Sequence, residues 1–166
     1  MKPVVVYESH WGNTKAVAQA VAEGLGHGAR ALTTDEAVGA AMEGVDLVVC
    51  GAPVIAFSLA RAGTRNQIAE DEKAPSPPDT AHPLMRDWLD ALPQGTGRSA
   101  AFETRIWWSP RGATGTIESK LRKAGYRPIA KGERFVVSGG YGPLREGKLE
   151  HARAWGAQLA ATASVG

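Results

Sequence analysis

The residues best suited to chemistry in this chain form one polar stretch near its N-terminus. Ser9 and Thr14 carry hydroxyl groups and Asn13 an amide, and all three groups hydrogen-bond phosphate oxygens well. An apolar run precedes the stretch, and an alanine-rich segment with helical spacing of its apolar residues follows it. Because the first N–H groups of a helix have no partners of their own, this succession predicts an anion site. The loop has no arginine and Lys15 is its one nearby cation, so hydrogen bonds and the helix dipole are expected to hold the phosphate.

Apolar runs without polar alternation predict strands that are buried on both faces, and amphipathic segments between them predict helices. The strands are expected over residues 4–6, 29–32, 45–50, 98–103 and 135–137, with Gly51-Ala52-Pro53 ending the third. Helices are expected after Thr14 and over residues 37–42, 63–70, 84–92, 117–124 and 146–161, the last with Leu149, Ala152, Trp155 and Leu159 facing inward. Strands that alternate with helices predict an α/β protein with a doubly wound five-stranded parallel sheet and helices on both faces.

The composition restricts the classes of protein that need to be considered. With 166 residues, the chain is expected to form a single domain over 1–166, with an exposed proline-rich excursion at about 71–83. The net charge of +2 argues against nucleic-acid binding, and the one cysteine favours a reducing compartment. No apolar run is long enough to cross a bilayer, so we expect a cytoplasmic protein without membrane insertion, as a monomer or a dimer.

Three loops are expected to meet at one edge of this sheet. In a doubly wound fold, ligands bind beyond the carboxyl ends of the strands, where the strand order reverses. The loops that reach this position are 8–14, 53–61 and 104–112. The first suits phosphate, whereas the other two are rich in apolar and aromatic residues such as Phe57, Trp107 and Trp108. This combination predicts a ligand with an anionic tail and a large, flat, apolar ring.

The first loop and its surroundings also carry a recognisable signature. Residues 5–21, Val5-Val6-Tyr7-Glu8-Ser9-His10-Trp11-Gly12-Asn13-Thr14-Lys15-Ala16-Val17-Ala18-Gln19-Ala20-Val21, resemble the flavodoxin signature, and the lack of a long insertion in the fifth strand resembles the short-chain type. The resemblance implies the strand order 2-1-3-4-5 and a non-covalently bound flavin mononucleotide (FMN). It implies that the phosphate is bound by Ser9, His10, Trp11, Gly12, Asn13 and Thr14. It also implies that the flavin ring lies between two loops, formed by Pro53, Val54, Ile55, Ala56 and Phe57 on one side and by Thr104, Arg105, Trp107 and Trp108 on the other.

Other residues have simpler interpretations. Adjacent residues of an extended chain point to opposite sides, so only one of Trp107 and Trp108 is expected to contact the ring. Cys50, at the end of a buried strand, is expected to pack in the core. The histidines have no metal-ligand spacing, and we predict neither a metal site nor a catalytic residue. The first loop has a single glycine, which excludes the nucleoside-triphosphate and dinucleotide fingerprints, and the isolated Glu8 argues against a phosphoreceiver domain.

Two features depart from the electron-carrying flavodoxins. Those carriers are usually strongly acidic, whereas this chain is slightly basic, with Arg61, Arg65, Arg105 and Arg111 in or beside the ring loops. The carriers also commonly have a glycine where the backbone flips towards the flavin. Residues 56–58 contain no glycine, which disfavours a stable one-electron-reduced state.

The sequence leaves three functions open. The leading hypothesis is an electron carrier that exchanges electrons with a redox partner protein through FMN. The second is an FMN-dependent reductase that takes hydride from NAD(P)H and reduces a quinone-type acceptor, which the missing glycine and the basic loops favour. The third is a flavin-free interaction module that acts through protein contacts alone. Whether the protein is an enzyme therefore stays undecided at this level.

Overall fold

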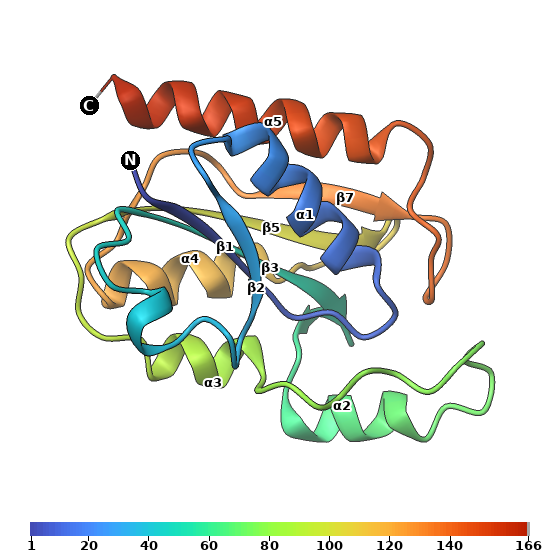
Figure 1. Cartoon of the computed structure of the whole chain (residues 1–166). Helices are drawn as coiled ribbons and strands as arrows, with labels where there is room; N and C mark the ends of the chain where they lie inside the picture. The colour runs from blue at the N-terminus through green and yellow to red at the C-terminus, as the bar shows by residue number, and fades with distance from the viewer. Residues whose placement is uncertain (166) are drawn as a thin grey trace.

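A parallel β-sheet forms the centre of the protein in the computed structural model, which describes residues 1–165 (Figure 1). Its parallel strands are β1 (Pro3–Tyr7), β2 (Arg30–Thr33), β3 (Leu47–Ile55), β5 (Arg98–Ile106), β6 (Arg127–Pro128) and β7 (Glu133–Val137). The order across the sheet is β2-β1-β3-β5, and β6 and β7 both pair in parallel with β5. The predicted order 2-1-3-4-5 is confirmed, with the fifth position divided between two short strands.

Helices cover both faces of the sheet, as the alternating pattern predicted (Figure 1). On one face lie α1 (Asn13–Leu25) and α5 (Lys148–Ser164), and on the other lie α3 (Met85–Asp90) and α4 (Thr114–Lys123). Strand β4 (Ser58–Leu59) forms a small antiparallel hairpin with the end of β3 and leads into α2 (Ala62–Ala69). The green α2 and the segment after it extend away from the sheet.

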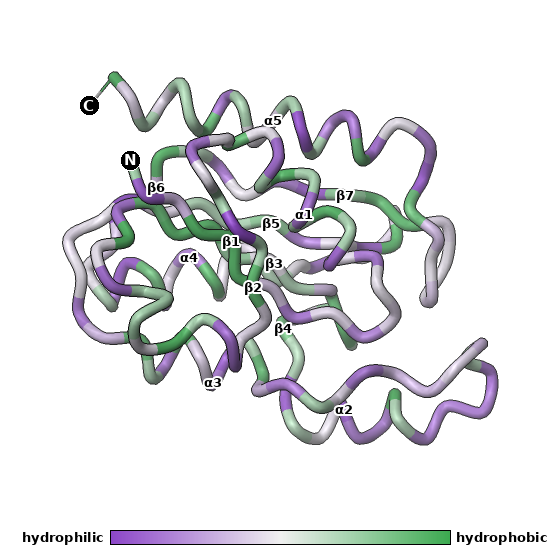
Figure 2. Tube along the Cα trace, in the orientation of Figure 1, coloured by the Kyte–Doolittle hydropathy of each residue, from purple (hydrophilic) through white to green (hydrophobic). Residues whose placement is uncertain are grey.

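The strands divide their side chains between two apolar layers. Val4 and Val6 of β1 belong to the cluster under α3 and α4, whereas Val5 belongs to the cluster under α1 and α5. Figure 2 accordingly shows hydrophobic residues concentrated along the central strands. Helices α1 and α5 pack so closely that a Cβ on Gly24 would lie 1.9 Å from the Arg153 carbonyl oxygen. Only glycine fits this crossing, which fixes α1 and therefore the loop that precedes it.

Strand β3 is longer than predicted, because it continues through Gly51-Ala52-Pro53 to Ile55. β1 pairs with β3 only as far as Gly51, whereas β5 pairs with β3 as far as Pro53. Beyond Gly51 one edge of β3 therefore has no neighbour in the parallel sheet, and a proline is tolerated on such an edge. The extension carries Pro53 and the two residues after it beyond the end of β1.

Two smaller predictions are wrong. Residues 37–42 do not form a helix but contain only the 3₁₀ turn η1 (Gly39–Ala41), because Gly39 adopts a left-handed φ of 54° that a right-handed helix excludes. Leu149, predicted to face inward, is 41% exposed in the first turn of α5, whereas the residues predicted to follow it inward, Ala152, Trp155 and Leu159, are buried.

Other expectations agree with the structure. Cys50 is buried in the core as predicted, and its burial raises the pKa of the thiol. Residues 71–83 contain neither helix nor strand, in accord with their prolines. Among residues 1–165, no helix has both the length and the apolarity needed to cross a membrane.

Candidate functional site

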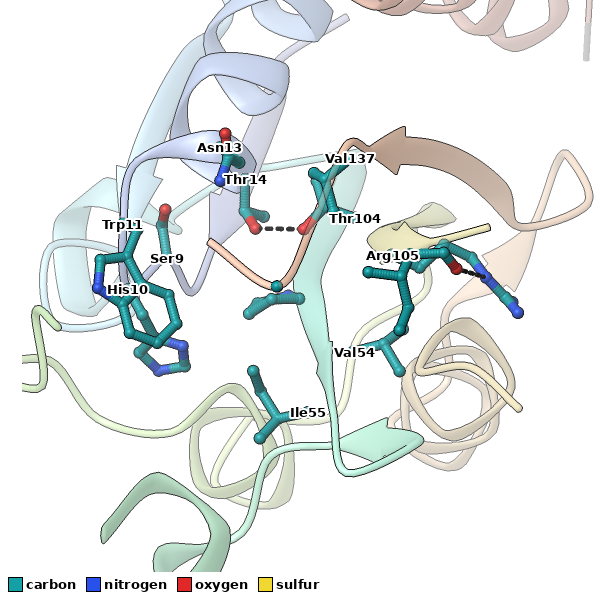
Figure 3. A pocket seen from close by; sticks show the side chains of 13 residues that line it. Ser9, His10, Trp11, Asn13, Thr14, Val54, Ile55, Thr104, Arg105 and Val137 are labelled. Carbon is teal, nitrogen blue, oxygen red and sulfur yellow. Dashed lines mark hydrogen bonds between the residues drawn. The ribbon is translucent and has the colours of Figure 1, made fainter. Parts of the chain in front are cut away.

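A cavity opens at the carboxyl ends of β1, β3 and β5, where the three predicted loops meet (Figure 3). It is open to solvent, and its cavity volume is about 100 Å³. The residues that line it are Ser9, His10, Trp11, Asn13, Thr14, Pro53, Val54, Ile55, Thr104, Arg105, Ile106, Val137 and Gly140. Ten of the fifteen residues predicted to form the ligand site line this cavity. The other three lining residues, Ile106, Val137 and Gly140, were not predicted.

The polar side of the cavity is the loop between β1 and α1. Gly12 adopts a left-handed φ of 95°, and its N–H donates to the Ser9 hydroxyl at 3.2 Å. The Gly12 carbonyl accepts from the Ala16 N–H at 3.0 Å, which is the first hydrogen bond of the helical ladder. Within residues 1–165, the N–H groups of the first three residues of α1, Asn13, Thr14 and Lys15, have no backbone acceptor. They are donors that an anion can use.

The side chains of Asn13 and Thr14 are already engaged by the protein. The Thr14 hydroxyl lies 2.8 Å from the Thr104 hydroxyl on β5, an interaction drawn in Figure 3. The Asn13 amide donates to the Tyr141 carbonyl at 3.2 Å, and a Cβ on Gly142 would lie 2.5 Å from the Asn13 side chain. These contacts hold the loop in place, so the backbone N–H groups and Ser9 are the main donors left for a ligand.

The proline-rich segment 71–83 covers the outside of this loop, a contact that the sequence did not indicate. The Asp79 N–H donates to the His10 carbonyl at 2.8 Å. The Trp11 indole N–H donates to the Ser76 carbonyl at 3.0 Å. The segment therefore supports the polar loop from a position that is remote in sequence.

A second link ties the same segment to the chain beyond β7. The Tyr141 hydroxyl donates a hydrogen bond to the Asp71 carboxylate, which lowers the pKa of Asp71 and raises that of Tyr141. The Tyr141 ring also packs edge-on against Trp11, with ring centres 4.9 Å apart. Trp11 is thus held between two segments, and its side chain stiffens the loop from outside.

The apolar side of the cavity is built by the end of β3. Pro53, Val54 and Ile55 line it, and Figure 3 shows Ile55 across the cavity from His10. Ala56 and Phe57 then form the hairpin turn to β4 with left-handed φ values of 48° and 64°. Two positive φ values in a row suit glycine or asparagine, so this turn stores backbone strain beside the cavity.

The aromatic residues predicted in the two ring loops, Phe57, Trp107 and Trp108, lie beside the cavity and do not line it. Trp107 is 68% exposed and Trp108 55% exposed, immediately after the lining residue Ile106. Trp108 meets Phe57 edge-on, with ring centres 5.8 Å apart. The two ring loops therefore touch each other through aromatic side chains at the edge of the site.

Arg105 lines the cavity, but its charge is used inside the protein. One guanidinium nitrogen lies 3.2 Å from the Glu103 carboxylate, and another donates to the Ser109 carbonyl. Glu103 is fully buried and also accepts from the Ala113 N–H at 3.1 Å and the Thr114 N–H at 3.2 Å, at the start of α4. The pair is a buried structural anchor, and Arg105 has little charge left for a ligand.

A second buried carboxylate, Glu8, was not predicted as a site residue. It directly follows β1, is 2% exposed and accepts from the Met85 N–H at 2.6 Å. Its second oxygen lies 3.1 Å from His10 Nε2, and Arg65 of α2 lies 3.9 Å from its first oxygen. A charged residue directly after a buried strand was the signal in the sequence, but nothing local links it to Arg65.

Fold and site together define an α/β protein with a loop of unpaired backbone N–H donors at the switch point of its sheet. No protein-family model matches the chain, and no curated protein matches it by sequence. Solved structures do match over nearly the whole chain. A flavodoxin from the domain Archaea is 20% identical with a TM-score of 0.64, and 99% of each chain is covered.

Two further solved structures give the same result. Flavodoxin 1 from Bacillus cereus is 15% identical with a TM-score of 0.62, covering 96% of this chain and 97% of that one. A WrbA-like flavodoxin from Agrobacterium tumefaciens is 19% identical with a TM-score of 0.61, covering 99% of this chain and 98% of that one. The chain therefore has the flavodoxin-like fold, as its first loop predicted.

Proposed function

We propose that the protein binds FMN non-covalently and carries electrons through it to or from a redox partner protein. The observation that supports this most is the convergence of two unlike surfaces on one cavity. The N-terminus of α1 offers unpaired N–H donors, and the end of β3 offers the apolar wall of Pro53, Val54 and Ile55. A ligand with an anionic tail and a flat apolar ring needs both surfaces, the N–H donors for the tail and the apolar wall for the ring. The solved structures of the same fold include flavodoxins.

The residues present fit such a group. A Cβ on Gly12 would have no heavy atom within 4 Å, so space is open at the start of α1 where a phosphate would be held. In this proposal Ser9, His10, Trp11, Gly12, Asn13 and Thr14 form the phosphate site. The ring site is formed by the lining residues Pro53, Val54, Ile55, Thr104 and Arg105, with Ala56, Phe57, Trp107 and Trp108 at its edge. FMN, when bound, supplies the electron-transfer chemistry.

The chain's own part is to bind, orient and exclude water. The N–H groups at the start of α1 and the Ser9 hydroxyl hold the phosphate. The apolar end of β3 and the residues Ile106 and Val137 remove water from the ring. Charge in a desolvated site is costly, so these walls would favour a neutral ring over an anionic one.

A titration of the purified protein with FMN and with riboflavin tests the proposal. We expect saturable quenching of FMN fluorescence, a higher thermal midpoint, and much weaker binding of riboflavin, which lacks the phosphate. A protein that binds neither flavin would contradict the proposal and leave the flavin-free module as the remaining hypothesis.

The reductase that uses NAD(P)H and a quinone-type acceptor is a second candidate, supported by the strained turn at Ala56 and Phe57. These residues already occupy left-handed φ values, so the backbone freedom that glycine would give is absent. NADPH added to the FMN-loaded protein without other proteins separates the candidates. Rapid bleaching of the flavin absorbance would favour the reductase, and no bleaching would favour the carrier.

A further inference from the structure

Unpaired buried polar atoms are concentrated under the phosphate loop. Among the described residues 1–165, the buried side-chain nitrogen and oxygen atoms without a hydrogen-bond partner are Glu8 Oε2, His10 Nδ1, His10 Nε2, Arg65 Nε and Arg86 Nε. All but the last belong to three residues that lie together. Buried polar groups are almost always paired with protein groups, water or an ion, so these atoms mark a place where a further group or a proton can be taken up.

These three residues form a charged cluster, which we name the His10 cluster: Glu8, His10 and Arg65. His10 Nε2 lies 3.1 Å from Glu8 Oε2, and Arg65 Nη2 lies 3.9 Å from Glu8 Oε1. The exposed fractions of the three side chains are 1% for His10, 2% for Glu8 and 14% for Arg65. His10 lines the same cavity as the predicted phosphate ligands Ser9 and Thr14, so a charge on its imidazole acts through space on an anion held in the loop.

The neighbouring charged groups are paired separately. His82 Nδ1 lies 2.6 Å from Asp35, and His82 Nε2 lies 3.2 Å from Asp79. Asp79 reaches His10 only through its backbone N–H. The charged group beside the His10 imidazole is therefore Glu8, with Arg65 acting through Glu8, and His82 is connected to this cluster through its carbonyl, which accepts from Arg65 at 2.7 Å.

The net charge of the cluster depends on whether the His10 imidazole carries a second proton. The negative charge of Glu8 and the positive charge of Arg65 cancel, so the cluster is neutral when the imidazole is neutral and carries one positive charge when it is an imidazolium. A phosphate monoester carries close to two negative charges at neutral pH. The loop above has no arginine, and Lys15 is its one nearby cation. The cluster can supply the charge that the loop lacks.

We propose that His10, oriented by Glu8 and Arg65, is a charge-compensating subsite that takes up one proton from solvent when a dianionic phosphate group occupies the loop. The inference rests on the proposed function, because that function places a phosphate in the loop. Glu8 and Arg65 are positioning residues, since they act on the phosphate through the imidazole. Binding and proton uptake are linked, so each strengthens the other by the same factor.

Sulfate is the sharpest probe, because it stays dianionic over the whole range in which histidine changes charge. Its affinity is measured from the NMR shifts of the amides of residues 9–15 at about pH 8 and about pH 6. We expect sulfate to bind about tenfold more tightly at the lower pH in the wild type. His10→Gln should abolish this dependence. His151→Gln should retain it, because His151 is a half-exposed histidine 3.8 Å from Glu133 on the other side of the sheet.

Glu8→Gln separates an electrostatic role from a structural one. The change keeps an acceptor for the Met85 N–H but removes the negative charge of the cluster. Sulfate should then bind several-fold more tightly at about pH 8, whereas a merely damaged loop would bind it more weakly. If His10→Gln does not fold, the imidazole ¹⁵N shifts of wild-type His10 are followed instead as sulfate is added at neutral pH. Movement towards the imidazolium values supports the proposal.

Several results would overturn it: an unchanged sulfate affinity between the two pH values, a slope that persists in His10→Gln, or an imidazole that does not respond to sulfate. FMN, riboflavin and inorganic phosphate in parallel distinguish this failure from that of the proposed function. If sulfate and phosphate bind more tightly at the lower pH but no flavin binds, the proposal for the His10 cluster is supported and the proposed FMN function is rejected. If FMN binds tightly but the affinity for sulfate does not change with pH, the FMN function is supported and the proposal for the His10 cluster is rejected.

Discussion

The two buried carboxylates, Glu8 and Glu103, occupy similar positions and have different surroundings. Each lies at the carboxyl end of a central strand and accepts the N–H group at the start of a helix, α3 for Glu8 and α4 for Glu103. Glu103 has donors for both oxygens, from Ala113, Thr114 and Arg105. Glu8 has a donor for one oxygen only, and the other lies unpaired beside His10.

The number of hydrogen-bond donors around a buried carboxylate distinguishes a residue that stabilises the fold from a residue that is suited to binding. A fully satisfied buried network gains from the low dielectric of the interior, and it makes one conformation rigid. A partly satisfied network is costly and persists where something else completes it. Glu103 therefore stabilises the fold, whereas the unpaired oxygen of Glu8 fits the role proposed above for the His10 cluster.

The largest effect is expected for Glu103→Ala. The substitution leaves the Arg105 guanidinium buried without its partner and removes the acceptor at the start of α4. We expect the free energy of unfolding to fall by about 3–5 kcal/mol, the usual cost of breaking a buried ion pair. Urea unfolding measures this, and a loss below about 1 kcal/mol would show that Glu103 is not an anchor.

Gly112→Ala tests the same anchor by crowding it. A Cβ at this position would lie 2.3 Å from Glu103 Oε1, so the carboxylate must move from its donors. We expect a destabilisation of about 1–3 kcal/mol in urea unfolding.

Gly115→Ala in α4 is the matched control, because a Cβ there meets no heavy atom within 4 Å. It should leave stability unchanged or raise it by up to about 1 kcal/mol, through helix propensity. Equal losses from both substitutions would contradict the role given to Glu103.

A direct comparison of Glu8→Gln with Glu103→Gln should give unequal results. Glutamine keeps the shape of glutamate, so the difference reports the charge and the number of donors lost. We expect a cost of about 1 kcal/mol or less for Glu8→Gln and of about 2 kcal/mol for Glu103→Gln. Thermal unfolding of the two variants measures this difference. A lower thermal midpoint for Glu8→Gln than for Glu103→Gln would contradict the assignment of Glu103 as the anchor.

The smallest effect concerns the exposed pair of Asp35 and His82, which lies next to the His10 cluster. Hydrogen bonds from Thr33 first and then His82 lower the pKa of Asp35 below its ordinary 3.8. A lowered folded-state pKa contributes stability above the unfolded value, and this contribution is lost as the pH falls through the folded value. The difference in stability between wild type and Asp35→Asn should therefore be constant near neutral pH and shrink below pH 3.8. A difference that grows towards acid would contradict the assignment.

Much of the fold could be predicted from the sequence because its signals are local. Runs such as Val4 to Val6 without polar alternation indicate strands covered on both faces, and the structure has them so. The extension of β3 through Pro53 could not be predicted, since it depends on which edge of the strand lacks a neighbour. The helix predicted over residues 37–42 does not form, because the single residue Gly39 adopts a left-handed φ.

The candidate site also has a part that could be predicted from local sequence and a part that could not. The polar loop could be predicted, because its donors are consecutive in sequence. The engagement of Arg105 and Glu103 inside the protein could not, because it depends on the Ser109 carbonyl and on the start of α4, which complete the partners of the pair. The His10 cluster depends on Arg65, and its cover depends on the backbone of residues 71–83. Contacts between remote segments leave no periodic signal in the chain.

The central claim, that the cavity at the carboxyl edge of the sheet binds FMN by its phosphate loop, is tested most directly by adding FMN to the purified protein. The account predicts an equimolar complex with quenched flavin fluorescence and with NMR shift changes centred on the amides of residues 9–15, 53–57, 104–108 and 137–140. Absence of binding, or shifts that leave residues 9–15 unchanged, would contradict it.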